Sequence, residues 1–280
     1  MNKIYKVKKN AAGHLVACSE FAKGHTKKAV LGSLLIVGIL GMATTASAQT
    51  TASAQQLALT NQKKGKGTHI GGGDNNTAKG TYLTIGGGSY NTVEGKHSTI
   101  GGGYQNQATG FNATVGGGYK NKATGFNATI AGGYLNTANS GHSTIAGGYN
   151  NKAEGNQSTV GGGSGNQATD SYSTISGGGD NRATGERSTI GGGRLNKATA
   201  INSTVAGGYD NRATGTGSTI AGGSKNQATG NGSFAAGIEN QATGNQFAIA
   251  CGYNNHATGE SSTVAGGSTN QAQGGASTVG

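Results

Sequence analysis

A large apolar residue recurs along most of the chain at a spacing of fifteen residues, from Ile70 to Val279, with one step of fourteen into Phe234. The residues between these positions are mainly Gly, Ala, Ser, Thr and Asn. An Asn follows fourteen of these positions by six residues, and an Ala follows that Asn by two, with Val93 as the exception. A fixed period with strict columns is typical of repeat proteins, whose units stack on their neighbours.

Each repeat contains two short segments with high β propensity, Ser-Thr-Ile-Ala and Asn-x-Ala-Thr, joined by Gly and Asn where a turn requires positive φ. The chain has no Pro, no three-residue period and no heptads, which excludes collagen and coiled coils. We therefore predict an all-β parallel β-solenoid, or β-roll, with coils of 15 residues and one of 14. Strand alternation places Ile220 and Gly222 on one face and Thr219 and Ala221 on the other.

Two columns receive structural roles. The apolar column is predicted to form the core, and its central members are Ile85, Ile100, Val115, Ile130, Ile145, Val160, Ile175, Ile190, Val205 and Ile220. The Asn column supports two roles, a ladder of side-chain amides along the axis or a residue with a left-handed turn backbone, and the sequence does not separate them. Its central members are Asn91, Asn106, Asn121, Asn136, Asn151, Asn166, Asn181, Asn196, Asn211 and Asn226.

The charge of the chain changes this picture little. Lys and Arg number 21 against 10 Asp and Glu, but seven of the lysines precede residue 29. The rest of the chain holds 14 basic and 9 acidic residues, without any run of one sign. Nucleic-acid binding needs basic stripes, so we expect no nucleic-acid partner.

The N-terminal 48 residues are predicted to be an extended signal peptide. Residues 1–28 form a Lys-containing n-region and residues 29–42 an apolar h-region that is too short to span a membrane. The small residues Ala46 and Ala48 favour cleavage between Ala48 and Gln49, and residues 52–54 offer a second site. Residues 49–67 are expected to be a flexible tip that the first coil orders in part, and residues 68–280 the repetitive domain.

Candidate chemical sites are few. Gly-x-Gly-x-x-Gly matches do not open a helix, so no nucleotide site is expected, and three Asp residues are too far apart for calcium. His97 and His142 share a column, but three coils, about 14 Å, separate them, too far for one metal. Because no nucleophilic set or carboxylate pair recurs, we expect no enzymatic activity, metal or cofactor.

One aromatic column and one cysteine remain. The column lies four residues after the apolar position, and its residues either pack at a turn or form a candidate ligand surface. Its members are Tyr104, Tyr119, Tyr134, Tyr149 and Tyr209, together with Tyr253. Cys251, the one cysteine outside the leader, replaces a Gly on the face of the apolar column, which indicates a small buried side chain. An interchain disulfide is the alternative.

Two parts of the sequence resemble one group of proteins. Residues 1–7, Met-Asn-Lys-Ile-Tyr-Lys-Val, and 16–24, Val-Ala-Cys-Ser-Glu-Phe-Ala-Lys-Gly, resemble the extended signal peptide region of large autotransporters of Gram-negative bacteria, although Lys9 stands where those leaders usually carry Trp. The repeat Thr-Ile-Gly-Gly-Gly-Tyr-x-Asn-x-Ala-Thr-Gly is similar to head repeats of trimeric autotransporter adhesins, and most of all to the ubiquitous surface protein A adhesins.

The resemblance implies a head of three chains, each a left-handed parallel β-roll, carried on a stalk with an outer-membrane anchor. It implies a cell-surface adhesin of type V secretion that contributes to virulence and binds epithelial cells and matrix proteins such as fibronectin, laminin or collagen. Because Gly280 falls inside a repeat, we expect this sequence to be a fragment, with membrane contact only through a C-terminal anchor that it lacks.

The composition independently favours a homotrimer. Residues 49–280 contain 26 Leu, Ile, Val and Phe among 232, which predicts too thin a core for one chain, so we expect the Ile/Val face to turn toward the other chains. The alternative function is an ice-binding or other surface-templating solenoid, because Thr also recurs once per coil. The regular Thr positions are Thr99, Thr114, Thr129, Thr144, Thr159, Thr174, Thr189 and Thr204.

The leader gives a direct prediction: the mature chain begins at Gln49, because the h-region ends a few residues before the Ala-Ser-Ala site. Edman sequencing or intact mass of protein recovered from the cell surface measures this. A chain that still begins at Met1 would contradict it.

Overall fold

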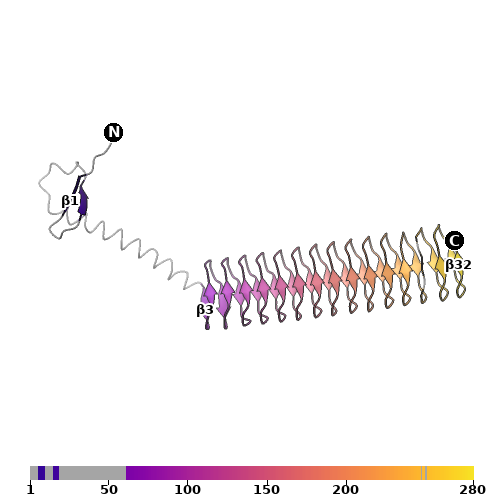
Figure 1. The fold of residues 1–280 in the computed structure, drawn as a ribbon, viewed down its shortest axis with the longest axis horizontal. Helices are drawn as coiled ribbons and strands as arrows, with labels where there is room; N and C mark the ends of the chain where they lie inside the picture. Colours follow the sequence, from indigo (N-terminus) through magenta and orange to yellow (C-terminus); the bar gives the residue numbers. More distant parts are fainter. Residues whose placement is uncertain (1–5, 10–14, 19–60, 247, 250) are drawn as a thin grey trace. The chain divides into compact units, whose positions relative to one another are not determined.

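The computed structural model describes residues 6–9, 15–18, 61–246, 248–249 and 251–280. The chain divides into two units, Met1–Gln56 and Leu57–Gly280, and the second contains the repeats (Figure 1). The described residues contain strands, turns and bends and no helix. The predicted all-β parallel solenoid is confirmed.

The described residues of the first unit, 6–9 and 15–18, form one pair of strands. β1 (Lys6–Lys9) pairs antiparallel with β2 (Leu15–Cys18), and Val7 lies opposite Ala17. The leader was expected to be helical or without regular structure, and these eight residues form paired strands instead, in which the β-branched Val7 and Val16 favour an extended backbone. The predicted h-region and the cleavage residues Ala46, Ala48 and Gln49 lie outside the described residues.

The second unit is built from two parallel sheets of fifteen strands each. The even sheet contains β4 (His69–Ile70), β6 (Thr84–Ile85), β8 (Thr99–Ile100), β10 (Thr114–Val115), β12 (Thr129–Ile130), β14 (Thr144–Ile145), β16 (Thr159–Val160), β18 (Thr174–Ile175), β20 (Thr189–Ile190), β22 (Thr204–Val205), β24 (Thr219–Ile220), β26 (Phe234–Ala235), β28 (Ala248–Ile249), β30 (Thr263–Val264) and β32 (Thr278–Val279).

The odd sheet contains β3 (Gln62–Lys64), β5 (Thr77–Lys79), β7 (Thr92–Val93), β9 (Gln107–Ala108), β11 (Lys122–Ala123), β13 (Thr137–Ala138), β15 (Lys152–Ala153), β17 (Gln167–Ala168), β19 (Arg182–Ala183), β21 (Lys197–Ala198), β23 (Arg212–Ala213), β25 (Gln227–Ala228), β27 (Gln241–Ala242), β29 (His256–Ala257) and β31 (Gln271–Ala272). It begins inside the segment 49–67 that the sequence assigns to a tip.

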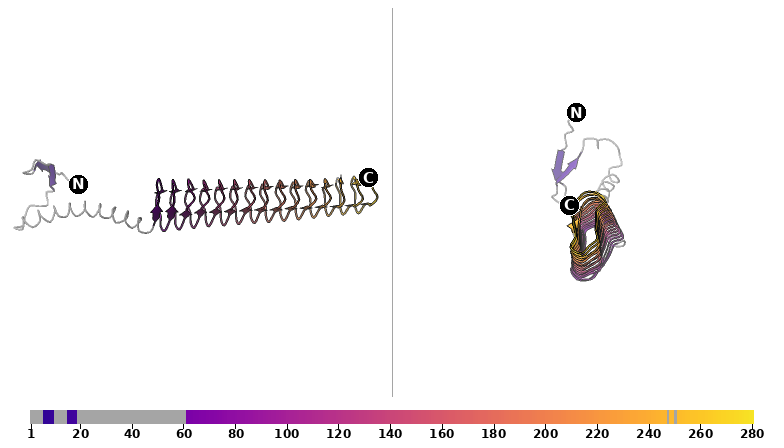
Figure 2. Two further views of the ribbon diagram at one scale, coloured as in Figure 1. Left: turned by 90° about the horizontal axis from the view of Figure 1, so that it is seen from below. Right: turned by 90° about the vertical axis from the view of Figure 1, so that its right-hand side faces the viewer.

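Every strand pairs with the same residues one coil away. Thr114 and Val115 lie beside Thr129 and Ile130 in the even sheet, and the odd sheet keeps the same register. A third row of parallel bridges connects the position four residues after the apolar column, from Asp74 to Ser268. Seen along its axis, the solenoid is a stack of superposed flattened rings (Figure 2). Each side chain therefore lies above its equivalent in the next coil.

The core lies between the two sheets. The Ile and Val side chains of the even sheet and the Ala side chains of the odd sheet are fully buried within one chain from Ile85 to Val264. The expectation that the Ile/Val face turns toward other chains is therefore wrong. Each coil folds back on itself, so the Ala column of the same chain covers the Ile/Val face. The outer side of the even sheet carries the Thr column, and the outer side of the odd sheet carries the residue before each Ala.

The short coil lies one residue later than the sequence indicated. Ala235 pairs with Ile220 and is buried, whereas Phe234 pairs with Thr219 and is only half-buried on the outer side. The step from Ile220 to Ala235 is thus fifteen residues, and the step of fourteen falls between Ala235 and Ile249. Assigning Phe234 to the core was wrong because register, set by the flanking strands, outweighs the greater hydrophobicity of Phe.

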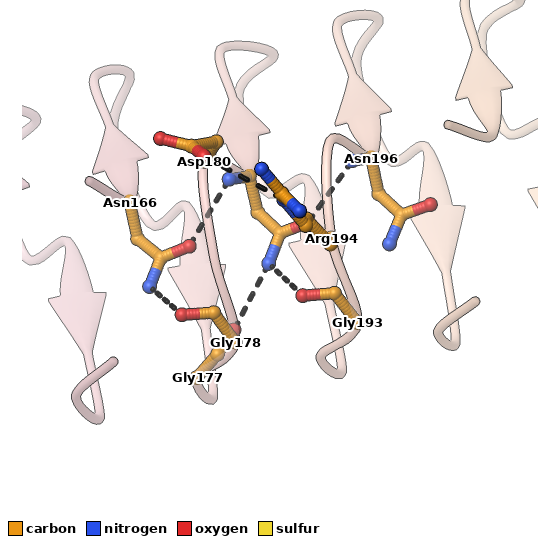
Figure 3. A network of polar contacts seen from close by, with 8 residues as sticks. Asn166, Gly177, Gly178, Asp180, Gly193, Arg194 and Asn196 are labelled. Carbon is orange, nitrogen blue, oxygen red and sulfur yellow. Dashed lines mark hydrogen bonds and ion pairs between the residues drawn. The ribbon is translucent and has the colours of Figure 1, made fainter. Parts of the chain in front are cut away.

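The Asn column connects successive coils through hydrogen bonds (Figure 3). The Nδ2 of Asn166 donates to the carbonyl oxygen of Gly162 in its own coil at 2.8 Å. It also donates to the carbonyl oxygen of Gly178 in the next coil at 2.9 Å, the contact drawn in Figure 3. Its Oδ1 accepts the backbone N–H of Asn181 at 3.1 Å. Because Asn166 is fully buried, each of these groups would lack water if its partner were removed.

The ladder role of Asn thus differs in detail from the expectation. The side chain mainly accepts from a backbone N–H rather than from another amide, as between Asn106 and Asn121. The left-handed backbone belongs to the residue before each Asn, such as Gln105 with φ 53° and Lys120 with φ 53°. Assigning positive φ to the Asn itself was therefore wrong.

One Gly column cannot accept a side chain. Gly103 has φ +88°, and a Cβ there would collide with the carbonyl oxygen of Gly118 and lie 2.7 Å from Nδ2 of Asn106. These are the carbonyl and amide groups that bridge the coils, so Gly is required where the backbone of one coil supports the Asn of another.

Replacing Asn166 with Asp tests this network. The carboxylate loses both N–H donors and faces the carbonyl oxygens of Gly162 and Gly178, so we expect about 3–5 kcal/mol of destabilisation at pH 7. Burial and these carbonyls raise the pKa of the introduced carboxyl above its unfolded value. The loss should therefore be smaller at pH 3 and grow as pH rises through the folded-state pKa. Thermal unfolding relative to the unsubstituted chain at each pH measures it.

Gln167→Glu is the matched control. It adds the same charge at the adjacent residue, which is half-buried on the outer side of the odd sheet, and should change stability by less than about 0.5 kcal/mol. Equal unfolding temperatures for Asn166→Asp and Gln167→Glu at pH 7 would show that the Asn network does not support the fold.

Candidate functional site

The tyrosine column forms a continuous exposed stack on one of the two connections between the sheets. Tyr104, Tyr119, Tyr134 and Tyr149 have successive ring centroids 5.3, 4.8 and 5.3 Å apart, with interplanar angles of 7–25°. Tyr134 and Tyr149 remain 41% and 51% exposed. Because each ring face packs against the next ring, the stack presents ring edges and hydroxyl groups to solvent.

Tyr209 is separate from this stack. Its bridge partners one coil away are Arg194 and Ser224, which carry no aromatic ring. Tyr209 is 45% exposed, so it forms an isolated aromatic group farther along the solenoid. The five tyrosines thus divide into a row of four and a single residue.

A second aromatic row lies on the other connection between the sheets. Tyr82 stacks on His97 at 5.1 Å, and Phe111 stacks on Phe126 at 5.3 Å. Edge contacts of 5.8 and 5.5 Å join His97 to Phe111 and Phe126 to His142. The sequence analysis missed this row because its members are divided between two adjacent columns. Tyr82, His97 and His142 lie three residues before the apolar position, and Phe111 and Phe126 lie four residues before it.

A shallow groove of about 490 Å³ opens beside the tyrosine stack on the outer side of the odd sheet. Lys120 and Lys122 line it together with Leu135, Gln107 and Tyr90. It is the place where the aromatic surface meets the basic side of the sheet.

Five of the fourteen basic residues of the solenoid lie in one column on this outer side. The register of the odd sheet aligns them at the position before the buried Ala. We call Lys122, Lys152, Arg182, Lys197 and Arg212 the basic column. Sequence analysis treated these charges as scattered, because in the chain they lie at least fifteen residues apart. In space they share one line.

The ion pairs within the described ranges are few and exposed. Lys225 Nζ lies 3.1 Å from Glu239 Oε1, and this hydrogen bond, together with the Glu239 charge, raises the pKa of Lys225. Arg194 Nε lies 3.9 Å from Asp180 Oδ2. Exposed pairs of this kind contribute little to stability, so these charges are available for other contacts.

The outer side of the even sheet has a different character. Thr side chains are half-buried there, and the next two positions in each coil are small residues, for example Gly101 and Gly102 after Thr99 and Ile100. From Thr84 to Thr219 no charged residue occupies these outward positions. The regular Thr positions of the sequence analysis all lie on this flat neutral face.

Cys251 is exposed, so the expectation of a small buried side chain is wrong. It stands in the column of Gly132 and Gly207, where an added Cβ meets nothing within 4 Å. The strands are only two residues long, so alternation does not extend from Ile249 to Cys251, and this column points to solvent.

Metal and membrane sites find no support in the described part of the chain. It contains no group of three His, Cys, Asp or Glu side chains arranged to bind a metal ion. No helix among the described residues is long and apolar enough to cross a membrane.

Comparison with known proteins identifies the type of repeat. A family model described as the ubiquitous surface protein adhesin repeat matches residues 143–155 and 203–215. The chain carries adhesin-like repeats. Both matches begin at the buried Ser before the Thr column and cover the same thirteen positions of a coil, four coils apart, so the family model and the structural coil share one unit. No curated protein matches the chain. Repeats of this type indicate a bacterial cell-surface adhesin.

The exposure of Cys251 predicts its reactivity. A maleimide should label Cys251 in the folded chain without denaturant, because the thiol is open to solvent. Mass mapping of the labelled peptide measures the extent. In a Cys251→Ser, Ser262→Cys chain the thiol replaces a fully buried hydroxyl and should label only after unfolding. Protection of Cys251 equal to that of the Ser262→Cys thiol would contradict the exposed position.

Proposed function

We propose that this chain is the head of a trimeric autotransporter adhesin, exported by type V secretion to the outer surface of a Gram-negative bacterium. It attaches to epithelial cells and to matrix proteins such as fibronectin, laminin or collagen by non-enzymatic binding. The observation that carries the proposal is the coincidence of the adhesin-repeat matches with the structural coil. The predicted extended signal peptide, residues 1–48, fits export of the chain.

Repetition is the physical basis of the proposed binding. A strand spacing of about 4.7 Å repeats each exposed group along the solenoid at a fixed interval. Linked weak sites raise avidity by about 10²–10⁴ when the target also repeats. Long fibrous matrix proteins are repetitive targets of this kind. Binding in a single pocket would gain no avidity from such a target.

The homotrimer we propose joins the outer sides of three even sheets. This face is flat and has no charge from Thr84 to Thr219, and interface centres are depleted in charged residues. Its Thr, Gly and Ala side chains are short, so three backbones can approach closely. The odd sheets then face outward, with both their basic and their neutral polar side chains in solvent.

The test introduces charge on each sheet. Thr129→Glu, Thr144→Glu and Thr159→Glu together place three carboxylates on the even sheet, and should convert a trimer of the full chain to monomers in sedimentation equilibrium. The control is Thr109→Glu, Thr124→Glu and Thr169→Glu, at half-buried positions just after the odd strands, in the column that Glu94 and Glu154 occupy. The control should remain trimeric.

Attachment is measured with the same proteins on immobilised matrix proteins and on epithelial cells. The trimer and the control should bind, and the monomeric variant should bind at least about 100-fold more weakly, because it keeps the repetition along one solenoid but loses the avidity of three linked solenoids. A monomeric unsubstituted chain would contradict the trimer. A trimer that binds no better than the variant would contradict the adhesin, and thermal hysteresis in that sample would favour the surface-templating alternative.

A further inference from the structure

The basic column is a straight line of charge on a rigid support. From Lys122 the next members follow at two, two, one and one coils, or about 9.5, 9.5, 4.7 and 4.7 Å. The column therefore extends over six strand spacings, about 28 Å. The parallel backbone pairing fixes these intervals, so the basic residues are already spaced along the sheet before a ligand binds.

Most of this charge lacks an intramolecular counterion. Among the residues that the structure describes, Arg212 is the one member with a carboxylate within salt-bridge distance, Asp210 at 3.5 Å. The acid nearest in sequence to Arg182, Asp180, is paired with Arg194. Glu154 lies two residues from Lys152 and forms no ion pair in the described structure. From residue 120 to 212 the outer side of the odd sheet is thus net positive.

The positions between the charges and at the two ends of the basic column carry neutral hydrogen-bonding groups. Gln107, Thr137, Gln167 and Gln227 occupy the same column as the basic residues, and each lies on the outer side of the sheet, half-buried. From Lys122 to Arg182 cationic groups therefore alternate with a hydroxyl and an amide, whereas Arg182, Lys197 and Arg212 follow one another in successive coils. A partner that carries both anionic groups and hydroxyls at regular intervals would satisfy both kinds of side chain.

The spacing distinguishes between linear polyanions. An extended acidic peptide repeats its side chains on one face about every 6.7 Å, which falls out of step with intervals of about 4.7 and 9.5 Å. Single-stranded nucleic acid gains affinity by stacking bases on aromatic faces, but the neighbouring Tyr faces already pack on one another at 4.8–5.3 Å. A linear polysaccharide stays in step with the column where its disaccharide repeat is about two strand spacings, near 9.5 Å.

We propose that the outer side of the odd sheet binds a linear sulfated polysaccharide, with the sulfate groups on the basic column and the sugar hydroxyls on its Gln and Thr residues. Arg and Lys bind such oxyanions by charge-assisted hydrogen bonds. The polysaccharide would be one class of partner for the proposed adhesin, and its biological role rests on that proposed function. The binding itself uses only the column of one chain.

The test measures binding of fluorescent heparin to the full chain at physiological ionic strength. The column variant is Lys122→Gln, Lys152→Gln, Arg182→Gln, Lys197→Gln and Arg212→Gln. Gln already stands in this column at Gln107, Gln167 and Gln227, so the sheet accommodates it. The column variant should bind at least about tenfold more weakly, with a smaller dependence of Kd on salt, because five cationic contacts are lost.

The control removes five positive charges elsewhere. Its substitutions are Lys66→Gln, Lys96→Gln, Arg187→Gln, Arg194→Gln and Lys225→Gln, all outside the column. Binding within about twofold of the unsubstituted chain is expected, since a dispersed net charge contributes little local contact. Thermal unfolding of both variants checks that they fold.

Three results would overturn the inference. The first is no heparin binding at physiological ionic strength, and the second is an equal loss in both variants, which would show a diffuse charge effect. The third is equal or tighter binding of polyglutamate or a single-stranded oligonucleotide of matched charge, which would assign the column to another polyanion. Heparin binding is measured without host cells or matrix proteins. A failure to bind heparin would therefore overturn this inference alone, and the attachment assay would still test the proposed adhesin function.

Discussion

The whole solenoid depends on a buried Asn that holds each coil to the next. Its side chain joins a carbonyl of its own coil, a carbonyl of the next coil and the backbone N–H of the next Asn, so neither coil can slip without leaving buried polar groups unpaired. The short coil shows how strict this is. That coil is one residue shorter, yet Asn240 keeps the contacts that the Asn column makes elsewhere. Its backbone N–H donates to Asn226 Oδ1 at 3.1 Å, and its Nδ2 donates to the carbonyl oxygen of Gly252 at 2.9 Å.

This register explains how so little apolar volume forms a closed core. Most coils bury one branched side chain and one Ala between the sheets, with Ala235 in the first position and Val93 in the second as exceptions. Burial of one Ile contributes only about 1.5–3 kcal/mol, so hydrogen bonds along the axis must supply much of what orders a coil. The hydrogen bonds form only between adjacent coils, which makes stability a property of the stack rather than of one repeat.

The period and the inward columns could be predicted from sequence, because they are the positions where every coil needs the same residue. Three features could not. The direction of Cys251 depends on strands being two residues long, which no alternation pattern reveals. Phe234 looks like a core residue until strand pairing places Ala235 inside. The Ile column looked available to other chains because a sequence does not show that the Ala column folds over it.

The surface columns follow the opposite rule, and this is why sequence reasoning missed the basic column. A position before a buried Ala makes no contact that the fold requires, so Lys, Arg, Gln, Thr and His all occur there. The residue type at this position therefore varies from coil to coil, while the strand register keeps all these residues in one line. Residues fifteen apart that look unrelated in sequence become neighbours about 4.7 Å apart in space. Aromatic rows concentrate between Tyr82 and Tyr149 and the basic column between Lys122 and Arg212, so different lengths of one uniform scaffold present different chemistry.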